Sequence, residues 1–207
     1  YLYDTALLRQ TLESVVSESN KYGYKVHYAI KANYDDHLLG IIREYGLGID
    51  CASGNELRKA VEAGFDPKGI VYAGVGKRDK ELRYAIEQGI LAINCESIQE
   101  LELIDRFSAE MGRVTDVALR INPDIDPKTN HCIDTGQADS KFGISYEEVL
   151  EHAEELRTLE HIRIIGLHLH IGSQIRELHV FENMCNKVNV SVENLEKIGV
   201  ELRLVDV

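Results

Sequence analysis

One lysine of the sequence stands where a lysine could act as a nucleophile. Lys31 follows the apolar run 26–30 and precedes Ala32 and Asn33. A lysine that leaves a buried strand is partly removed from water, which favours the uncharged amine, a form able to make a Schiff base with a carbonyl compound. The alternative is a surface lysine whose charged end reaches solvent, and position alone favours it.

Two histidines that lie two residues apart form a second candidate site. Residues 166–174 read Gly-Leu-His-Leu-His-Ile-Gly-Ser-Gln, and strand alternation would place His168 and His170 on the same side. The Gly-Ser turn that contains Ser173 offers backbone amides and a hydroxyl that could hold a phosphate. The two histidines could instead bind zinc in a metal-dependent hydrolase with Lys31 as a modified bridging residue. They could also be buried histidines bonded to the backbone.

Two charged residues end further apolar runs. Asp50 could orient a cation, or it could help Ser53 to cap the next helix. Arg120 could pair with a phenolate, a phosphate or a carboxylate, and a structural ion pair explains it equally well. The Lys141-Phe142-Gly143 segment indicates little by itself.

The elements that position these residues repeat along the chain. Seven short apolar runs are expected to be strands: 24–30, 47–50, 70–73, 91–94, 116–121, 162–170 and 202–207. Several are apolar on both faces, as in parallel strands buried on both sides. Alternating strands and helices form either an open doubly wound sheet or a (β/α)8 barrel. Because polar residues end nearly every run, we predict an α/β TIM-type barrel, incomplete with about seven strands.

Local signals predict the helix ends and the remaining segments. Three helices are expected to begin with capping boxes: Ser53/Glu56, Ser97/Glu100 and Ser145/Glu148. Six glycines are expected to follow helices in the left-handed conformation: Gly23, Gly46, Gly64, Gly89, Gly112 and Gly199. Residues 4–20 place an apolar stripe on one helix. Residues 1–4 resemble a short spare strand, and 123–137 a long loop over the barrel mouth.

Composition excludes some classes of partner. The net charge of −12 argues against a nucleic-acid partner. No apolar run approaches the roughly 20 residues that cross a bilayer, and the first residues do not read as a signal peptide. The four cysteines form no C-x-x-C motif, which favours reduced thiols and a cytoplasmic protein.

Taken together, the motifs resemble those of the barrel decarboxylases that use pyridoxal 5′-phosphate (PLP). This family includes diaminopimelate, ornithine and biosynthetic arginine decarboxylases, with alanine racemase more distant. Three motifs occur in the family's order: 28–33 (Tyr-Ala-Ile-Lys-Ala-Asn), 50–53 (Asp-Cys-Ala-Ser) and 119–123 (Leu-Arg-Ile-Asn-Pro). Residues 166–175 and the Thr135–Gly143 region are similar to the diaminopimelate branch. The resemblance spans the whole chain.

The resemblance implies a role for each candidate. Lys31 would be the catalytic residue that holds PLP as a Schiff base, His170 would stack on its ring, and Ser173 would bond its phosphate. Asp50 and Arg120 would line the ring and the lysine. No metal is expected, and His168 has no family role and keeps its structural interpretation.

The implied activity is decarboxylation of meso-2,6-diaminopimelate to L-lysine in lysine biosynthesis. A sibling enzyme for ornithine, arginine or a carboxylated polyamine is the alternative, as is a PLP-binding barrel without catalysis. The resemblance makes 5–207 a truncated PLP-binding barrel domain and assigns the strand at 1–4 to a C-terminal β-domain absent from this chain. The family's glycine-rich phosphate loop, its acid for the ring nitrogen and its arginine for the distal carboxylate would follow Val207. A small amino-acid substrate and a homodimer are the implied partners.

Overall fold

The computed structural model of the chain describes residues 2–122, 142–173 and 175–207. The predicted loop 123–137, and residues Thr135 to Lys141 of the branch-specific region, lie outside the described residues. The chain divides into two compact units, Tyr1–Leu91 and Ala92–Val207, and each is described by itself.

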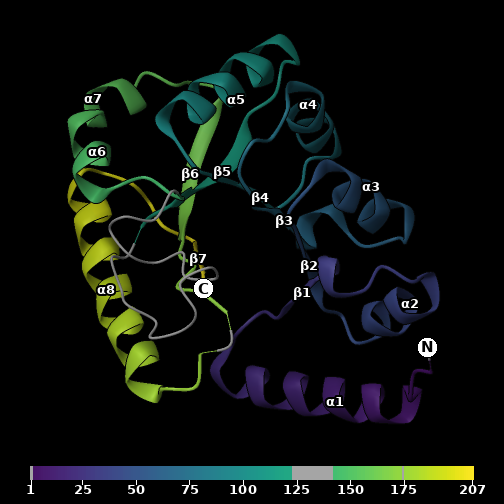
Figure 1. Cartoon of the computed structure of the whole chain (residues 1–207). Helices are drawn as coiled ribbons and strands as arrows, with labels where there is room; N and C mark the ends of the chain where they lie inside the picture. Colours follow the sequence, from purple (N-terminus) through teal and green to yellow (C-terminus); the bar gives the residue numbers. More distant parts are fainter. Residues whose placement is uncertain (1, 123–141, 174) are drawn as a thin grey trace. The chain divides into compact units, whose positions relative to one another are not determined.

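The first unit consists of three parallel strands with helices between them (Figure 1). Strand β1 pairs with β2, and β2 pairs with β3. In chain order its elements are α1 (Thr5–Tyr22), β1 (His27–Ala29), the 3-10 turn η1 (Ile30–Ala32), α2 (Asp36–Glu44), β2 (Gly48–Cys51), α3 (Gly54–Glu62), the 3-10 turn η2 (Pro67–Gly69), β3 (Ile70–Tyr72) and α4 (Asp79–Gln88). Helices α2, α3 and α4 flank one side of these strands.

The second unit continues the same repeat with four parallel strands. Strand β5 lies between β4 and β6, and β6 lies between β5 and β7. Its elements are β4 (Ala92–Cys95), α5 (Ile98–Glu110), β5 (Thr115–Arg120), α6 (Tyr146–Glu151), α7 (Ala153–Leu156), β6 (Ile162–His168), α8 (Leu178–Lys197) and β7 (Leu204–Asp206). In both units each strand neighbours the next strand of the chain. This order fits a barrel and lacks the reversal of a doubly wound sheet.

The strands of the second unit curve. The side-chain amide of Asn94, at the end of β4, donates a hydrogen bond of 2.7 Å to the carboxylate of Asp206, at the end of β7. Strands β5 and β6 lie between these two strands in the sheet, so a flat sheet would hold their ends too far apart, at about 4.8 Å per strand step. The four residues of β4 are all fully buried, which places the core of this unit around that strand.

The predicted helix starts are confirmed. The hydroxyls of Ser53, Ser97 and Ser145 accept hydrogen bonds from backbone amides three residues later, at 3.3, 3.2 and 3.1 Å. In a capping box the glutamate accepts a hydrogen bond from the backbone amide of the capping serine. At Ser53 and Ser97 the structure differs: Glu56 and Glu100 each accept from the amide of the residue before the serine. All six glycines expected after helices have a positive φ, between 61° and 89°.

The chain start differs from the predicted strand. Residues 2–4 form no strand, and the side chain of Asp4 instead caps α1 by accepting from the amides of Ala6 and Leu7 at 2.9 and 3.0 Å. Asp4 has the extended backbone angles of a capping residue, so it is extended without pairing in a sheet. Its pairing with a second domain stays a prediction, since no such domain lies within these residues.

Candidate active site

Lys31 lies in the middle of the turn η1, directly after β1. The hydroxyl of Tyr28 donates to the carbonyl of Asn33 at 3.1 Å, so a hydrogen bond closes around the turn that carries Lys31. Burial raises the pKa of Tyr28, which keeps its hydroxyl a donor at neutral pH. This hydrogen bond therefore links residues on the two sides of Lys31.

The expected removal of Lys31 from water is not found. Lys31 is exposed, whereas its neighbour Ile30 is fully buried. The cause is the turn. Strand β1 ends at Ala29 and η1 begins at Ile30, so the side chain of Lys31 no longer follows the alternation of the strand and points to solvent. The amine is thus accessible, and its placement at the carboxyl end of β1 is as predicted.

Asp50 reaches the same end of the first unit. It lies in β2 opposite Ala29, two residues before Lys31, and is half-buried. The capping role considered for Asp50 belongs to Ser53 and Glu56. The next residue, Cys51, is fully buried, and burial raises the pKa of its thiol, with the negative charges of Asp50 and Glu56 adding to the effect. Cys51 is therefore a neutral thiol of the core.

Arg120 ends β5 in the second unit and is almost fully buried. Its Nη1 donates to Oε1 of Glu96 at 2.6 Å, and its guanidinium carbon lies 5.4 Å from the ring centre of Phe142. The structural ion pair weighed for this residue is thus present. It uses one of the guanidinium's five N–H donors.

His168 and Asp206 continue the same row of residues. Arg120 is the register partner of His168, which is the partner of Asp206. The buried Nδ1 of His168 lies 3.1 Å from Oδ2 of Asp206, outside the alignment of a hydrogen bond. The same oxygen accepts from Asn94. His168 is therefore a buried side chain of the strand ends, in agreement with its structural interpretation.

His170 and Ser173 lie beyond the end of β6. The predicted strand 162–170 stops at His168, so strand alternation does not extend to His170. His170 is half-buried, Gly172 has a φ of 121°, and Ser173 is exposed. Gln174 of this motif lies outside the described residues. Within residues 2–122, 142–173 and 175–207, no group of three His, Cys, Asp or Glu side chains is arranged to hold a metal ion.

Sequence reasoning assigned no role to two carboxylates of these strand ends: it noted Glu96 only as a polar residue that ends an apolar run, and it did not note Asp206. Glu96 directly follows β4 and Asp206 ends β7. The signal was a polar residue at the end of an apolar run, the same criterion that selected Asp50 and Arg120. Applied to every strand, it would have included both carboxylates.

The chemistry of the predicted residues fits PLP. Each lies at, or just after, the carboxyl end of its own strand, where α/β barrels collect functional groups. An exposed amine suits the cofactor aldehyde, and an exposed hydroxyl beside a positive-φ glycine suits its phosphate. The guanidinium of Arg120, the carboxylate of Asp50 and the imidazole of His170 suit the charged, aromatic ring of PLP.

Every helix of the described residues is too short or too polar to span a bilayer.

Comparisons with known proteins agree with this geometry. Residues 8–207 match the family model described as the pyridoxal-binding domain of pyridoxal-dependent decarboxylases. The diaminopimelate decarboxylase of Bacteroides thetaiotaomicron is 47% identical over 197 residues, which cover 95% of this chain and 51% of that protein. The chain spans about half the length of the curated relatives it matches.

Solved structures show the same fold. The diaminopimelate decarboxylase of Helicobacter pylori, complexed with L-lysine, has a TM-score of 0.87 and 31% identity over 95% of this chain and 51% of that one. The M. jannaschii enzyme, also in complex with L-lysine, has a TM-score of 0.85 and 33% identity over 95% and 48%. These likenesses confirm the predicted fold class, a PLP-decarboxylase α/β barrel, of which the described residues contain seven strands.

Proposed function

The chain belongs to the family of pyridoxal-dependent decarboxylases, and from that premise we propose that the protein converts meso-2,6-diaminopimelate to L-lysine and CO2. The observation that carries the proposal is the 47% identity to a diaminopimelate decarboxylase over 95% of the chain. The order of motifs from Lys31 to Ser173 supports it. The alternatives are a decarboxylase for ornithine, arginine or a carboxylated polyamine, and a PLP-binding barrel without catalysis.

In this proposal Lys31 binds the cofactor aldehyde through its amine. Its exposure leaves the amine accessible to the cofactor and to the amino group of a substrate that displaces it. Asp50, at the same end of the first unit, supplies a negative charge near the lysine. When bound, PLP supplies the electron sink for the bond that breaks as CO2 leaves.

The second unit supplies orientation. His170 stacks on the cofactor ring, the hydroxyl of Ser173 donates to the phosphate, and Arg120 places a fixed positive charge beside the ring. Arg120 suits this role because it is buried and carries a permanent positive charge. Preorganised charge of this kind lowers a barrier without rearrangement during the reaction.

Labelling tests the assignment of Lys31. Borohydride reduction of the full-length holoenzyme, followed by peptide mapping, should place the pyridoxyl group on Lys31. Lys25, an exposed lysine just before β1, is an internal control and should stay unlabelled. A label on any lysine other than Lys31 would refute the assignment.

Substrate assays test the reaction itself. The full-length protein with PLP should release CO2 from meso-diaminopimelate much faster than from ornithine or arginine. A preference for either of those substrates would favour a sibling enzyme, and PLP binding without CO2 release from any of the substrates would favour the non-catalytic barrel.

The phosphate contact can be tested by affinity. Ser173→Ala should weaken PLP binding by about 1–3 kcal/mol, the loss of a hydrogen bond to a charged group. Ser17→Ala, at an exposed position in α1, is the matched control. His170→Ala should also weaken binding, and stoichiometric zinc lost from that variant would revive the hydrolase alternative.

The homodimer and the cytoplasmic location belong to the same proposal. The family resemblance supports both. Light scattering of the full-length protein should give twice the mass of one chain.

A further inference from the structure

Arg120 is held on two sides by residues to which no role has been assigned. We propose that Glu96 and Phe142 are positioning residues that fix the guanidinium of Arg120 for the cofactor. This inference rests on the proposed function, in which Arg120 lies beside the PLP ring. It also explains the Phe142-Gly143 pair, which the sequence alone left without a meaning.

The first contact is a buried ion pair. The side chains of Arg120 and Glu96 are only 9% and 10% exposed, and their closest atoms are 2.6 Å apart. Charged hydrogen bonds in such surroundings are strong and depend on orientation, so the pair restricts the guanidinium to a narrow range of positions. Glu96 is itself fixed, because its backbone amide donates to Glu100 at 2.7 Å, where α5 begins.

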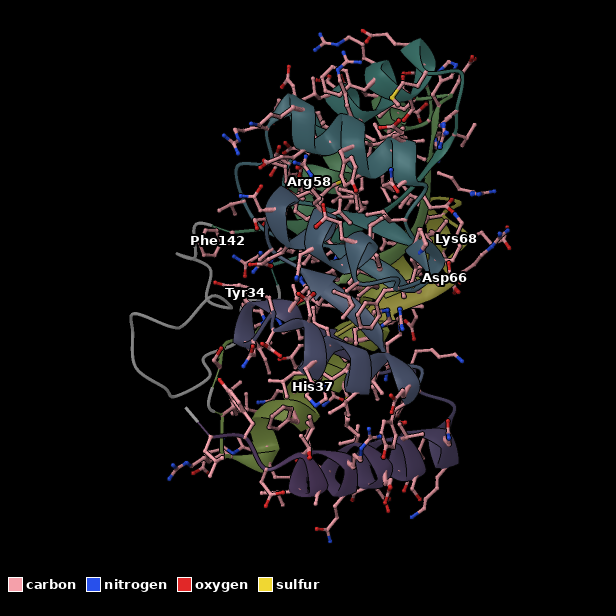
Figure 2. All side chains as sticks on the ribbon, turned by 90° about the vertical axis from the view of Figure 1, so that its right-hand side faces the viewer. Tyr34, His37, Arg58, Asp66, Lys68 and Phe142 are labelled. Atoms are coloured by element: carbon pink, nitrogen blue, oxygen red, sulfur yellow. The ribbon has the colours of Figure 1, made fainter. Side chains whose placement is uncertain are left out.

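The second contact is an aromatic face. Phe142, labelled in Figure 2, lies with its ring centre 5.4 Å from the guanidinium carbon of Arg120, within the range of a cation–π contact. Two backbone hydrogen bonds hold this segment against the end of β5. Ile144 donates to the carbonyl of Arg120 at 2.8 Å, and Asn122 donates to the carbonyl of Ile144 at 3.1 Å.

Gly143 makes this approach feasible. Its φ of +87° is unfavourable for other residues, and a Cβ at this position would lie 3.0 Å from the carbonyl oxygen of Arg120. A side chain there would push the segment away from β5 and take the Phe142 ring with it. Gly143 therefore allows the ring of Phe142 to lie against the guanidinium of Arg120.

Asp206 is a second carboxylate at these strand ends, and it has other partners than Arg120. Asp206 lies one strand beyond His168, accepts from Asn94 at 2.7 Å and lies 3.1 Å from Nδ1 of His168. The ion pair of Arg120 is therefore with Glu96.

The two carboxylate oxygens of Glu96 differ in their hydrogen bonding. Its Oε1 accepts from Arg120, whereas Oε2 is buried with no hydrogen-bond donor among the described residues. Purely structural carboxylates at this burial normally have both oxygens satisfied, because an unpaired buried oxygen is costly.

The test compares cofactor affinity among variants of the full-length protein. The apoenzyme is titrated with PLP by visible absorbance, and the unfolding temperature of each apoenzyme is measured in parallel. Arg120→Ala is the reference, and its dissociation constant for PLP should rise about tenfold or more, as for loss of a charged hydrogen bond. Glu96→Gln should raise the constant by about threefold to tenfold, and Phe142→Leu by about twofold to fivefold.

Two further variants separate positioning from folding. Glu96→Asp keeps the charge and should bind PLP more tightly than Glu96→Gln. Asp116→Asn breaks another arginine–carboxylate pair on β5, with Arg163 at 2.6 Å but at the far end of the strand, and should leave PLP affinity unchanged. Because Glu96 acts through Arg120, the double variant Glu96→Gln/Arg120→Ala should bind PLP no more weakly than Arg120→Ala alone.

The outcomes distinguish this inference from the proposed function. If Arg120→Ala weakens PLP binding and Glu96→Gln does not, the positioning role is wrong and the cofactor site stands. The positioning role also fails if the effects of Glu96 and Arg120 add, or if Glu96→Gln lowers the unfolding temperature with no change in affinity. If Arg120→Ala binds PLP normally, Arg120 leaves the proposed site and the positioning role falls with it, whereas the labelling of Lys31 still tests that site separately.

Discussion

The strand ends of the two units are built in opposite ways. In the first unit, Lys31 is exposed on a short turn, and the bond that closes the turn joins Tyr28 and Asn33, five residues apart. In the second unit, Arg120 and Asp206 are tied to Glu96 and Asn94 by side-chain bonds that span 24 and 112 residues. Asn33 also donates to the hydroxyl of Tyr3, 30 residues away, at 3.0 Å. The clearer difference is burial: Lys31 is exposed, whereas Arg120 is buried and Asp206 is half-buried.

This difference matches the work proposed for each region. A lysine that must bond to a cofactor and be displaced by substrate needs freedom to move, and exposure gives its side chain that freedom. Charged groups that orient a ring must not move, and burial with distant partners fixes them. The contrast predicts that changes in the first region affect chemistry, while changes in the second affect stability as well.

The largest effect is expected at Lys31. Lys31→Ala in the full-length protein should lower CO2 release from diaminopimelate by about a thousandfold or more, because the covalent anchor is lost. Its free energy of unfolding should stay within about 0.5 kcal/mol of wild type, since the side chain is exposed. Assays of activity and urea unfolding measure both, with Lys25→Ala as control. A strongly destabilised Lys31→Ala protein would contradict the contrast between the regions.

The opposite behaviour is expected at Asn94. Asn94→Ala removes a fully buried side chain that donates to Asp206, so the free energy of unfolding should fall by about 2–3 kcal/mol. Urea unfolding of the full-length apoenzyme measures this, and Asn55→Ala at an exposed position of α3 provides the matched control. Equal stability of the Asn94 and Asn55 variants would show that the distant bond does not hold the strand ends.

A smaller effect is expected at Tyr28. Tyr28→Phe removes the bond to Asn33 and should lower the free energy of unfolding by about 1 kcal/mol. Burial raises the pKa of Tyr28 above its ordinary value, so the protonated hydroxyl is favoured in the folded state. The difference between wild type and variant should therefore be constant below about pH 10 and should shrink as pH rises through the folded-state pKa. A difference that grew above pH 10 would contradict this assignment.

The sequence predicted the repeated strands and helices better than it predicted the contacts between side chains. Capping serines and terminal glycines are local signals that located the helix ends, as Ser53 and Gly23 show. Apolar runs located the seven strands of the sheet but not all of their ends, since the strand predicted at 24–30 covers only His27–Ala29. The exposure of Lys31 depends on a single 3-10 turn, which has no strong sequence signal. The partners of Arg120 and Asp206 depend on which strands lie side by side and on how they curve, and local patterns do not contain that information.

The smallest effect tests whether local bonds also stabilise the first unit away from Lys31. At the start of α4, Glu81 accepts from the amide and the guanidinium of Arg78, at 3.0 and 2.8 Å. The Arg78 side chain is the largest influence on the pKa of Glu81 and lowers it. Because Arg78 is 63% exposed, solvent screens the pair, and Glu81→Gln should cost at most about 1 kcal/mol at pH 7.

The sign of the pH dependence follows from the lowered pKa. The stabilisation from ionised Glu81 is present above the unfolded-state pKa of about 4.3 and is lost as pH falls through the lower folded-state value. The difference in unfolding free energy between wild type and Glu81→Gln should therefore shrink below about pH 4. Glu18→Gln, which removes an exposed pair with Lys21 in α1, is the control for a general effect of charge. A Glu81 difference that stayed constant to pH 2 would show that packing, and not the ionised cap, holds the start of α4.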